Sequence, residues 1–457
     1  APGTVFGAFP GAKFNGEDFI PAAIEAGAVA VVARSEAGVS GAVHVTATEP
    51  RQTFAQLAAA YFAPFPAVIV AVTGTNGKTS CVEMTRQLWH MGGERSASIG
   101  TLGVTTSDDS VSTGLTTPDI VTFLGNMSGL AREGVTHVAY EASSHGLDQF
   151  RNEGVPVMAG AFTNFSRDHL DYHGTMEAYF AAKMRLFDAV LQPGATAVIW
   201  HGTDDTSWAL KATEHAQRRG LQVLNVGERG EFIRLVSRTP TQLGQTLAIE
   251  FQGKARTINL PLIGAYQAAN ALVSCALAIA TGSPASQVFD AAARLQPVRG
   301  RLERAAITAR GAPVYVDYAH TPDALEAAIA ALRPHVEGRL VTVFGAGGDR
   351  DAGKRSAMGA AAARGSEVVI VTDDNPRGED PAAIRAAVLA GAPGAIEIGD
   401  RRAAIAEAIR QAGPRDIVLV AGKGHEQGQI IGSGENMRVL PFDDVQVARE
   451  CAAAEVR

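Results

Sequence analysis

A glycine-rich turn that carries a lysine and a threonine is the segment of this sequence best suited to phosphate chemistry. Residues 73–79 read TGTNGKT and follow an apolar run at residues 68–72. Backbone N–H groups of such a turn, and of a helix that begins after it, converge on an anion. The Lys78 ammonium would reach the β- and γ-phosphates of a nucleotide, and the Thr79 hydroxyl would bind Mg²⁺. Val72 stands where the strict motif has glycine, so a glycine-rich connection with an incidental lysine is the alternative.

Carboxylate and histidine side chains further along the chain offer ligands for a hard cation. Glu141 directly follows the apolar run at residues 137–140, and Asp168 and His169 lie in the segment NFSRDHLDYH. Mg²⁺ prefers oxygen ligands and is usually bound by few protein groups together with substrate phosphates. Thr79 and Glu141 would therefore hold one Mg²⁺ against a nucleotide. Taken singly, such residues are more often surface or capping groups than metal ligands. Their placement in the fold must decide between the two.

Buried strands that alternate with alanine-rich helices would place these groups together. Short apolar runs, each followed by a Gly- or Asp-rich turn, predict strands at residues 67–72, 137–140, 195–200, 340–344, 367–371 and 417–420. This pattern is typical of doubly wound, mainly parallel α/β sheets. Ligands of open α/β sheets bind outside the carboxyl ends of the strands, so these groups should share one sheet edge. Alternating stretches at residues 246–251 and 255–260 predict a β-meander inserted in the central domain.

Two segments that contain proline, YFAPFP at 61–66 and QPVRGR at 296–301, predict domain boundaries. They divide the 457 residues into three parts. We expect a small N-terminal α/β domain at 1–66, a central domain with a P-loop ATPase-like parallel sheet and helices at 67–297, and a C-terminal Rossmann-like domain at 298–457.

The composition excludes several classes of protein. Hydrophobic residues make up 46% and charged residues 19%, which favours large packed cores over a disordered chain. The formal net charge of −7 disfavours non-specific nucleic-acid binding. Three separated cysteines, Cys81, Cys275 and Cys451, predict neither a disulfide framework nor a CxxC metal site. No apolar run approaches the roughly 18–20 residues that cross a bilayer, so we expect a cytoplasmic protein without membrane insertion.

The order of the motifs in this sequence resembles that of the Mur ligases of peptidoglycan synthesis, most closely their MurE branch. The resemblance spans nearly the whole chain. Its motifs are TGTNGKT at 73–79, TTP at 116–118, EASSHG at 141–146, NFSRDHLDYH at 164–173, DYAHTP at 317–322, GGDRDAGKR at 347–355, DNPR at 374–377 and GKGHE at 422–426. Each motif alone is weak, but the ordered set is highly specific.

The resemblance implies an ATP-dependent ligase. The γ-phosphate of ATP would activate the terminal carboxylate of UDP-MurNAc-L-Ala-D-Glu, and an incoming amine would attack the acyl phosphate to give an amide, ADP and phosphate. Lys78 and two Mg²⁺ ions would screen the repulsion between the two anions. The resemblance also implies that Lys183 is carbamylated, a carboxylate-like form that would hold the second Mg²⁺ together with His169. From spacing alone, Lys183 is an ordinary helix-surface lysine.

The remaining site residues carry over from the family by position. The catalytic residues would be Lys78, Glu141, His169 and Lys183, and the metal ligands Thr79, Glu141, His169 and Lys183. ATP would be bound by Gly74, Thr75, Asn76, Gly77, Lys78, Thr79, Asn270, Arg301, Asp317 and His320. The UDP-muramyl substrate would contact Thr116, Thr117, Ser143, Gln149 and Arg151. The family also has a Ser-Asp-Ser-Arg-like segment before Pro2 and Gly3, so we expect part of the uridine site to lie outside these residues, with the loop at 10–16 completing it.

Three buried strands of the C-terminal domain lead into polar loops, which should meet at one sheet edge. Arg350, Arg377 and Glu426 would then converge, and two arginines with one carboxylate suit a zwitterionic amino acid. In the family, DNPR is typical of the enzymes that add meso-diaminopimelate, whereas lysine-adding enzymes lack the arginine. The resemblance therefore implies a diaminopimelate site made by Arg350, Asp374, Asn375, Pro376, Arg377, Gly422 and Glu426. An unpaired buried arginine would disfavour lysine by a factor on the order of 10²–10⁴.

Two other functions stay open at this point. A lysine-adding MurE or a folylpolyglutamate synthetase-like ligase would share the phosphate loop and central fold, although Arg377 argues against the first and the TTP motif with the small N-terminal domain against the second. A non-catalytic nucleotide-binding regulator would have lost the phosphate-loop lysine or the metal ligands, which are all present here. The expected ligands are ATP, the UDP-muramyl dipeptide and meso-diaminopimelate. We expect the protein to be a monomer.

Overall fold

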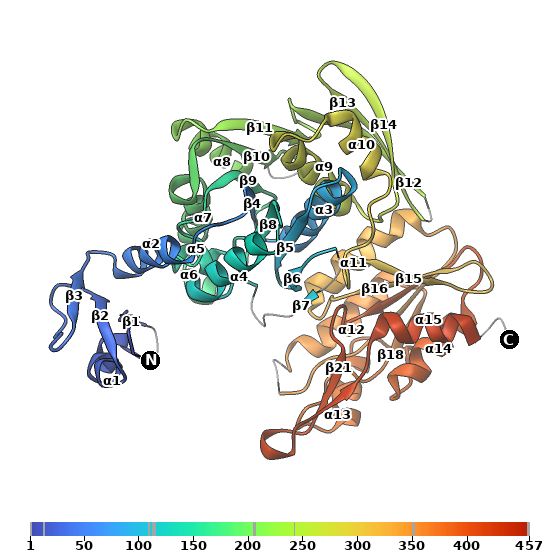
Figure 1. The fold of residues 1–457 in the computed structure, drawn as a ribbon. Helices are drawn as coiled ribbons and strands as arrows, with labels where there is room; N and C mark the ends of the chain where they lie inside the picture. Colours follow the sequence, from blue (N-terminus) through green and yellow to red (C-terminus); the bar gives the residue numbers. More distant parts are fainter. Residues whose placement is uncertain are drawn as a thin grey trace. The chain divides into compact units, whose positions relative to one another are not determined.

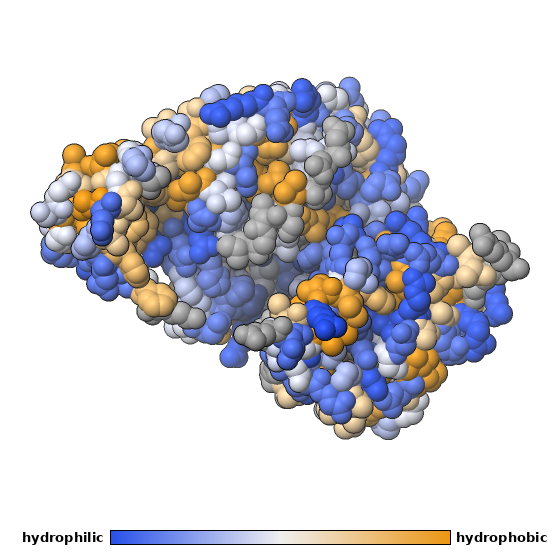
Figure 2. Space-filling model, turned by 60° about the horizontal axis from the view of Figure 1, so that its bottom comes forward, coloured by the Kyte–Doolittle hydropathy of each residue, from blue (hydrophilic) through white to orange (hydrophobic). Residues whose placement is uncertain are grey.

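The computed structural model describes residues 2–11, 14–107, 110–111, 116–203, 207–241, 243–349 and 352–454. The chain forms two compact units, one made of Ala1–Arg234 and Leu272–Val288 and the other of Leu235–Ala271 and Phe289–Arg457. Within the described residues, no helix is both long and apolar enough to cross a bilayer. On the face seen in Figure 2, hydrophilic side chains dominate and apolar ones form small separate groups.

The first part of unit 1 is a small α/β layer. Its sheet consists of three parallel strands in the order β1-β2-β3, namely β1 (Thr4–Gly7), β2 (Ala28–Ala33) and β3 (Val43–Thr46). The helical segments of this part are η1 (Gly16–Phe19), α1 (Ile20–Glu25) and α2 (Pro50–Phe62). Ile20, Val31 and Ala33 form its apolar core, so the layer has its own small hydrophobic cluster.

The rest of unit 1 is built around a mainly parallel sheet with strand order β11-β10-β9-β4-β8-β5-β6-β7. Its strands are β4 (Val68–Thr73), β5 (Ser96–Gly100), β6 (Gly103–Thr105), β7 (Ser110–Val111), β8 (His137–Glu141), β9 (Val157–Phe162), β10 (Leu191–Trp200) and β11 (Gln222–Gly227). The helices are α3 (Lys78–Met91), α4 (Ile120–Arg132), α5 (Ser144–Asp148), α6 (Leu170–His173), α7 (Met176–Arg185), the π-helical η2 (Leu186–Val190) and α8 (Ser207–Arg218). In Figure 1 these helices surround the teal and green strands. Among the described strands of unit 1, the pairs β5–β6 and β6–β7 are antiparallel.

Strand β4 occupies the centre of this sheet because it is apolar on both faces. Ile69, Val70 and Val72 are completely buried, and β4 pairs in parallel with β8 on one side and β9 on the other. A strand covered on both faces is the environment in which an uninterrupted apolar run is stable. The turn that follows β4 therefore emerges at the middle of the carboxyl edge of the sheet.

Unit 2 contains an antiparallel hairpin and a second parallel sheet. The chain passes from unit 1 to unit 2 within β12 (Ile233–Thr241), and β13 (Gly244–Phe251) pairs antiparallel with β14 (Lys254–Leu260). The six-stranded sheet has the order β15-β16-β20-β17-β18-β19, with β15 antiparallel and the others parallel. Its strands are β15 (Glu303–Ile307), β16 (Pro313–Asp317), β17 (Leu340–Phe344), β18 (Val368–Val371), β19 (Ile396–Glu397) and β20 (Ile417–Ala421).

Helices cover both faces of the six-stranded sheet, since two separate apolar clusters pack against it. The helical segments that follow the hairpin are α9 (Ala265–Ala280), which starts in unit 2 and continues into unit 1, α10 (Ala285–Ala292), α11 (Pro322–Leu332), η3 (Arg333–His335), α12 (Lys354–Gly365), α13 (Pro381–Leu389), α14 (Arg401–Gln411), η4 (Gly434–Asn436) and α15 (Asp444–Ala454). A separate two-stranded antiparallel sheet is formed by β21 (Gly428–Ile431) and β22 (Arg438–Pro441).

The predicted α/β class and all six predicted strands are confirmed. Five of them begin and end within one residue of the predicted limits, whereas β10 begins at Leu191, four residues early. Pro193 and Gly194 hide this start from the sequence pattern, and the pairing of β10 with β9 shifts register between Leu191 and Thr196. The predicted antiparallel pairing is found in β13 and β14, and burial alternates along β13 as the sequence does, but both strands belong to unit 2 and not to the central unit.

Candidate active site

The phosphate loop has the conformation that its sequence predicts. Helix α3 begins at Lys78, directly after Gly77, whose φ of 87° is left-handed. Gly74 has φ 144°, and a Cβ at this position would lie 2.0 Å from the Thr163 Oγ1 atom, so only glycine fits here. The Lys78 ammonium donates to the carbonyl oxygens of Gly74 at 2.9 Å and Thr75 at 2.8 Å. The loop thus holds its lysine against its own backbone.

A polar segment after strand β9 braces the phosphate loop, and sequence reasoning gave it no such role. The Asn76 amide donates to Asn164 Oδ1 at 2.9 Å, and the Thr163 hydroxyl donates to the Asn76 carbonyl at 2.6 Å. The Thr75 hydroxyl donates to the Ser166 carbonyl at 3.2 Å and accepts from the Ser166 amide at 3.0 Å. The signal that points to this brace is a run of polar residues directly after the strand that neighbours β4.

Glu141 lies beside the phosphate loop because of strand pairing. It ends β8, where it pairs in register with Val72, the residue before the loop begins. Its side chain is almost fully buried, and its Oε1 atom accepts a 2.7 Å hydrogen bond from the Thr101 amide. Its Oε2 atom accepts a long 3.4 Å hydrogen bond from the Thr101 hydroxyl. One carboxylate oxygen is therefore fixed, and the other is weakly engaged and suited to a cation.

Lys183 is a buried lysine of α7, not the helix-surface lysine that spacing alone suggests. It is 1% exposed, its ammonium donates to the Gly74 carbonyl at 2.7 Å, and it lies 4.4 Å from the centre of the Tyr179 ring. Lys78 donates to the same carbonyl oxygen. Burial, and next the charge of Lys78, lower the pKa of Lys183 well below its usual value, because the two ammonium groups repel. The site therefore favours the neutral amine of Lys183.

His169 occupies a more open position near Lys183. It precedes α6 with a left-handed φ of 51°, and its Nε2 atom lies 3.4 Å from a carboxylate oxygen of Asp168. The Tyr179 ring neighbours both predicted metal ligands, since its centre is 6.0 Å from the His169 ring and 4.4 Å from the Lys183 amine. His145 packs edge-on against His169 with ring centres 4.9 Å apart. The second predicted metal position thus has an aromatic wall.

The five residues predicted to bind the UDP-muramyl substrate lie close together. The Thr117 hydroxyl hydrogen-bonds to Ser143 Oγ at 2.9 Å and to the Glu141 carbonyl at 3.1 Å. The Arg151 guanidinium donates to the Thr117 carbonyl at 3.0 Å and to Gln149 Oε1 at 2.5 Å. The burial of Arg151, with the charge of Arg51, lowers its pKa.

Thr116 belongs to the same network, because its hydroxyl lies 3.0 Å from the Thr101 hydroxyl, which in turn contacts Glu141. The predicted substrate residues and the predicted metal carboxylate therefore form one connected set of hydrogen bonds in unit 1.

In unit 2, the four residues predicted to contact the nucleotide form a second group. The buried Asp317 carboxylate ends β16 and accepts from the amides of Leu302 at 2.8 Å and Ala319 at 2.9 Å. Burial raises the pKa of Asp317, opposed by the charge of Arg301. The Arg301 guanidinium lies 5.4 Å from the centre of the Tyr318 ring.

Gln267 links two more members of this group, because it donates to the Arg301 carbonyl at 3.0 Å and accepts from Asn270 at 3.3 Å. His320 Nδ1 lies 2.8 Å from the Tyr318 carbonyl oxygen.

The residues predicted to bind diaminopimelate follow strands β18 and β20. Asn375 donates to Glu426 Oε2 at 3.0 Å, which joins the two loops. Arg377 has a left-handed φ of 51°, and its guanidinium donates to the Gly348 carbonyl at 2.9 Å. A Cβ at Gly422 would lie 2.5 Å from the Asp374 carboxylate, so this position needs glycine.

Pro376 is buried between Asn375 and Arg377 in the first of these loops. Arg350 lies outside the described residues.

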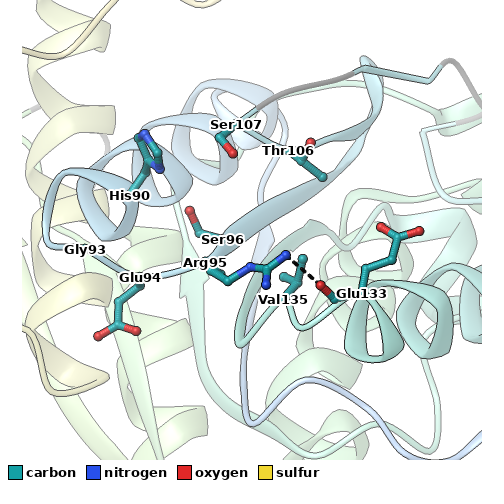
Figure 3. A pocket seen from close by; sticks show the side chains of 9 residues that line it. All are labelled: His90, Gly93, Glu94, Arg95, Ser96, Thr106, Ser107, Glu133 and Val135. Carbon is teal, nitrogen blue, oxygen red and sulfur yellow. Dashed lines mark hydrogen bonds between the residues drawn. The ribbon is translucent and has the colours of Figure 1, made fainter.

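The described residues contain no ready-made metal cluster, and the cavity described below lies away from the predicted site. Among the described residues, no group of three His, Cys, Asp or Glu side chains is arranged to hold a metal ion, so any Mg²⁺ would rely on few protein ligands and on substrate. A cavity of about 260 Å³ lies at the amino ends of β5 and β8, where Arg95 reaches across to the Glu133 carbonyl at 2.6 Å (Figure 3). It lies at the opposite edge of the sheet from the phosphate loop and contains none of the predicted site residues.

Comparison with known proteins agrees with these features. The pattern described as the Mur ligase middle domain matches residues 72–278, and the pattern described as the Mur ligase, glutamate ligase domain matches residues 300–424. A UDP-N-acetylmuramoyl-L-alanyl-D-glutamate–2,6-diaminopimelate ligase of Zymomonas mobilis is 62% identical over 450 residues, which cover 98% of this chain and 92% of that protein. The chain belongs to the Mur ligase family.

Other relatives of this Mur ligase show the same relationship. A protein of the same name from Bradyrhizobium diazoefficiens is 50% identical, with 100% of this chain and 93% of that protein covered. A solved structure of a diaminopimelate ligase of this name is 34% identical with a TM-score of 0.76, covering 100% of this chain and 93% of that chain. The MurF ligase of Thermotoga maritima, solved with ADP, is 20% identical with a TM-score of 0.61, and the match covers 100% of this chain and 95% of that chain. This last likeness shows a shared fold.

Proposed function

We propose that this Mur ligase is an ATP-dependent enzyme that joins meso-diaminopimelate to UDP-MurNAc-L-Ala-D-Glu through an acyl-phosphate intermediate. The observation that carries the proposal is the hydrogen-bond network of Thr117, Ser143 and Glu141 beside the phosphate loop. It joins Thr117 and Ser143, which suit a polar substrate, to the backbone carbonyl of Glu141, the residue whose carboxylate suits a cation. Relatives that are 50–62% identical over nearly the full chain carry the name of this activity.

The phosphate loop would position ATP and stabilise charge on the transferred phosphoryl group. The amide groups of the loop and the start of α3 suit phosphate oxygens. Lys78, now hydrogen-bonded to the carbonyls of Gly74 and Thr75, would exchange these contacts for phosphate. The glutamate carboxylate of the substrate then attacks the γ-phosphorus, the acyl phosphate forms and ADP leaves. The amine of diaminopimelate attacks the acyl carbon, an amide bond forms and phosphate leaves.

Mg²⁺ fits the oxygen ligands at this edge of the sheet. Thr79 in the first turn of α3 and Glu141 at the end of β8 would hold one ion. The ion supplies positive charge that neutralises the phosphates. Glu141 is suited to this role because its Oε1 atom is fixed by the Thr101 amide while its Oε2 atom makes a weak 3.4 Å contact.

A carbamate on Lys183 would complete a second Mg²⁺ site with His169. The chemistry needs a neutral amine, and burial with the charge of Lys78 lowers the pKa of Lys183. Attack of the amine on CO₂ forms a nitrogen–carbon bond and releases one proton. The product places a carbamate beside the Lys78 ammonium, so attraction takes the place of the repulsion that a protonated Lys183 would meet. A pair of opposite charges is more stable in a buried position than a pair of like charges.

The amino acid would bind at the loops after β18 and β20. Glu426 would accept from the distal ammonium of diaminopimelate, and Arg377, with Arg350, would bind its distal carboxylate. Asp374 and Asn375 belong to the same loop as Arg377, and Gly422 leaves space for the Asp374 carboxylate. Asn270, Arg301, Asp317 and His320 would contact the nucleotide. The protein would act in the cytoplasm as a monomer, with domain limits near residues 66 and 297.

Amino-acid-dependent phosphate release tests the proposed function. Purified protein with ATP, Mg²⁺ and UDP-MurNAc-L-Ala-D-Glu should release phosphate when meso-diaminopimelate is added. L-Lysine should be used at least 100-fold less efficiently, because it leaves Arg377 unpaired. Use of L-lysine as efficient as that of meso-diaminopimelate would contradict the proposed specificity. Turnover of folate with glutamate, and none of the muramyl dipeptide, would replace the proposed function.

A further inference from the structure

The Lys423 ammonium is completely buried between the two loops that would bind the amino acid. It donates to Asn375 Oδ1 at 2.7 Å and to the Gly428 carbonyl at 2.7 Å. It also lies 3.7 Å from the carboxylates of Asp374 and Glu426. None of the roles derived above uses this lysine. The sequence signal is an ammonium-bearing residue two positions after a buried strand, where an apolar or small residue is more usual.

The hydrogen bonds around Asn375 fix the direction of its amide group. Asn375 Oδ1 accepts from Lys423 and also from the Ile430 amide at 2.9 Å. Both donors lie on the oxygen side, so the amide nitrogen must point the other way, where it donates to Glu426 Oε2 at 3.0 Å. If the Asn375 amide were flipped, its NH₂ group would face the two donors from Lys423 and Ile430, and both hydrogen bonds would be lost. The contact between Asn375 and Glu426 therefore depends on the ammonium behind it.

A buried ammonium needs a physical reason, because burial disfavours its charge. Burial lowers the pKa of Lys423, while the charges of Asp374 and Glu426 oppose this shift. At 3.7 Å these carboxylates are attracted to the ammonium without taking its hydrogen bonds. Lys423 thus offsets one of the two negative charges. The nearby charges of Arg401 and Asp444 cancel in an ion pair, so one net negative charge remains, which suits a ligand with one ammonium group at this end.

We propose that Lys423 is a positioning residue of the amino-acid site, which orients the Asn375 amide and through it holds the Glu426 carboxylate toward the ammonium of the incoming amino acid. This inference rests on the proposed function. Lys423 has no direct contact with substrate in this role. Its removal should weaken binding of the amino acid and leave the binding of ATP and of the muramyl substrate unchanged.

The experiment compares the full-length protein with Lys423→Met in steady-state phosphate release. The Michaelis constant for meso-diaminopimelate should rise at least 10-fold, because a hydrogen bond from a charged donor is lost and Glu426 is no longer held. The Michaelis constants for ATP and for UDP-MurNAc-L-Ala-D-Glu should change less than twofold. Asp416→Asn is the matched control, since it weakens a contact of Asp416 with Arg339 at the other end of β20. It should leave all three constants unchanged.

A double-mutant cycle separates positioning from a general structural effect. If Lys423 acts through Asn375, then Lys423→Met should change the Michaelis constant for diaminopimelate less than threefold in an Asn375→Ala background. A 10-fold rise in both backgrounds would reject the proposal. So would an equal rise in all three constants.

Lys423→Gln is the second variant, because it keeps a polar group in the buried position. If neither Lys423 variant folds while Asn375→Ala does, the lysine is structural and the proposal is rejected. Failure of the wild-type protein to use diaminopimelate would instead reject the proposed function.

Discussion

Replacing Gly100 by alanine should disable the predicted metal ligand Glu141 without changing any predicted site residue. Gly100 is the last residue of β5 and lies against the Glu141 side chain. A Cβ at Gly100 would lie 2.1 Å from Glu141 Oε1 and 2.7 Å from its carboxyl carbon. Contacts below 3.0 Å are essentially never seen for a Cβ atom. The carboxylate must therefore retreat by about 0.9 Å, the difference between these distances.

A displacement of about 1 Å in a positioned catalytic group costs on the order of 100-fold in rate. We therefore expect kcat for phosphate release to fall about 100-fold, equivalent to about 2.7 kcal/mol in activation free energy. The Mg²⁺ concentration required for half-maximal rate should rise, because the ligand no longer reaches the ion. The Michaelis constant for diaminopimelate, which would bind in unit 2, should change little.

The assay is phosphate release at several Mg²⁺ concentrations, with melting temperature as a check of folding. Gly129→Ala in helix α4 is the matched control, since a Cβ there meets no atom within 4 Å. It should retain full activity. A Gly100→Ala protein that folds and keeps normal kcat and Mg²⁺ dependence would refute the assignment of Glu141 as a metal ligand.

Arg377, Lys183 and His425 can each be tested on its own. Arg377→Ala should raise the Michaelis constant for diaminopimelate about 100-fold and improve the use of L-lysine, which then leaves no arginine unpaired, as measured by phosphate release with each amino acid. Protein stripped of CO₂ should lose at least 90% of its activity, on the order expected for a missing metal ligand, and bicarbonate should restore it if Lys183 is carbamylated; equal activity without CO₂ would contradict this. Burial, with the charges of Arg301 and Arg299, lowers the pKa of His425 to about 4 from 6.5. The unfolded chain therefore binds this proton first as pH falls, so the stability that the neutral ring provides is complete above pH 6.5 and is lost toward pH 4. Replacing His425 by phenylalanine should reduce the fall in the free energy of unfolding between pH 7 and pH 5 by about 2 kcal/mol. Thermal unfolding at the two pH values measures this difference.

The phosphate loop could be predicted from the sequence because its geometry is local. The apolar strand, the two glycines and the first turn of α3 are contiguous, and each residue restricts its own backbone. Gly74 and Gly77 have the positive φ angles that the turn requires. For the same reason the paired strands β13 and β14 were predictable, since their alternating side chains are a property of neighbouring residues.

The environment of Lys183 could not be predicted in this way. Its hydrogen bond to the Gly74 carbonyl joins residues that are 109 positions apart. The repulsion between its amine and that of Lys78 exists because strand order brings α7 beside the loop. The Asn164 contact to Asn76 and the Lys423 contact to Asn375 are of the same kind, since the partners are 88 and 48 positions apart.

The amino-acid pattern was enough to predict the α/β class, the six buried strands, the phosphate loop and the chemical types of the site residues. Each of these depends on short-range periodicity or on the backbone preference of single residues. The three-dimensional fold was needed to show which side chains share a hydrogen bond, which oxygen of Glu141 is weakly engaged, and that Lys423 contacts Asn375 on the side away from Glu426. Those outcomes depend on strand order and burial, which set the distance and the dielectric environment between groups far apart in the chain.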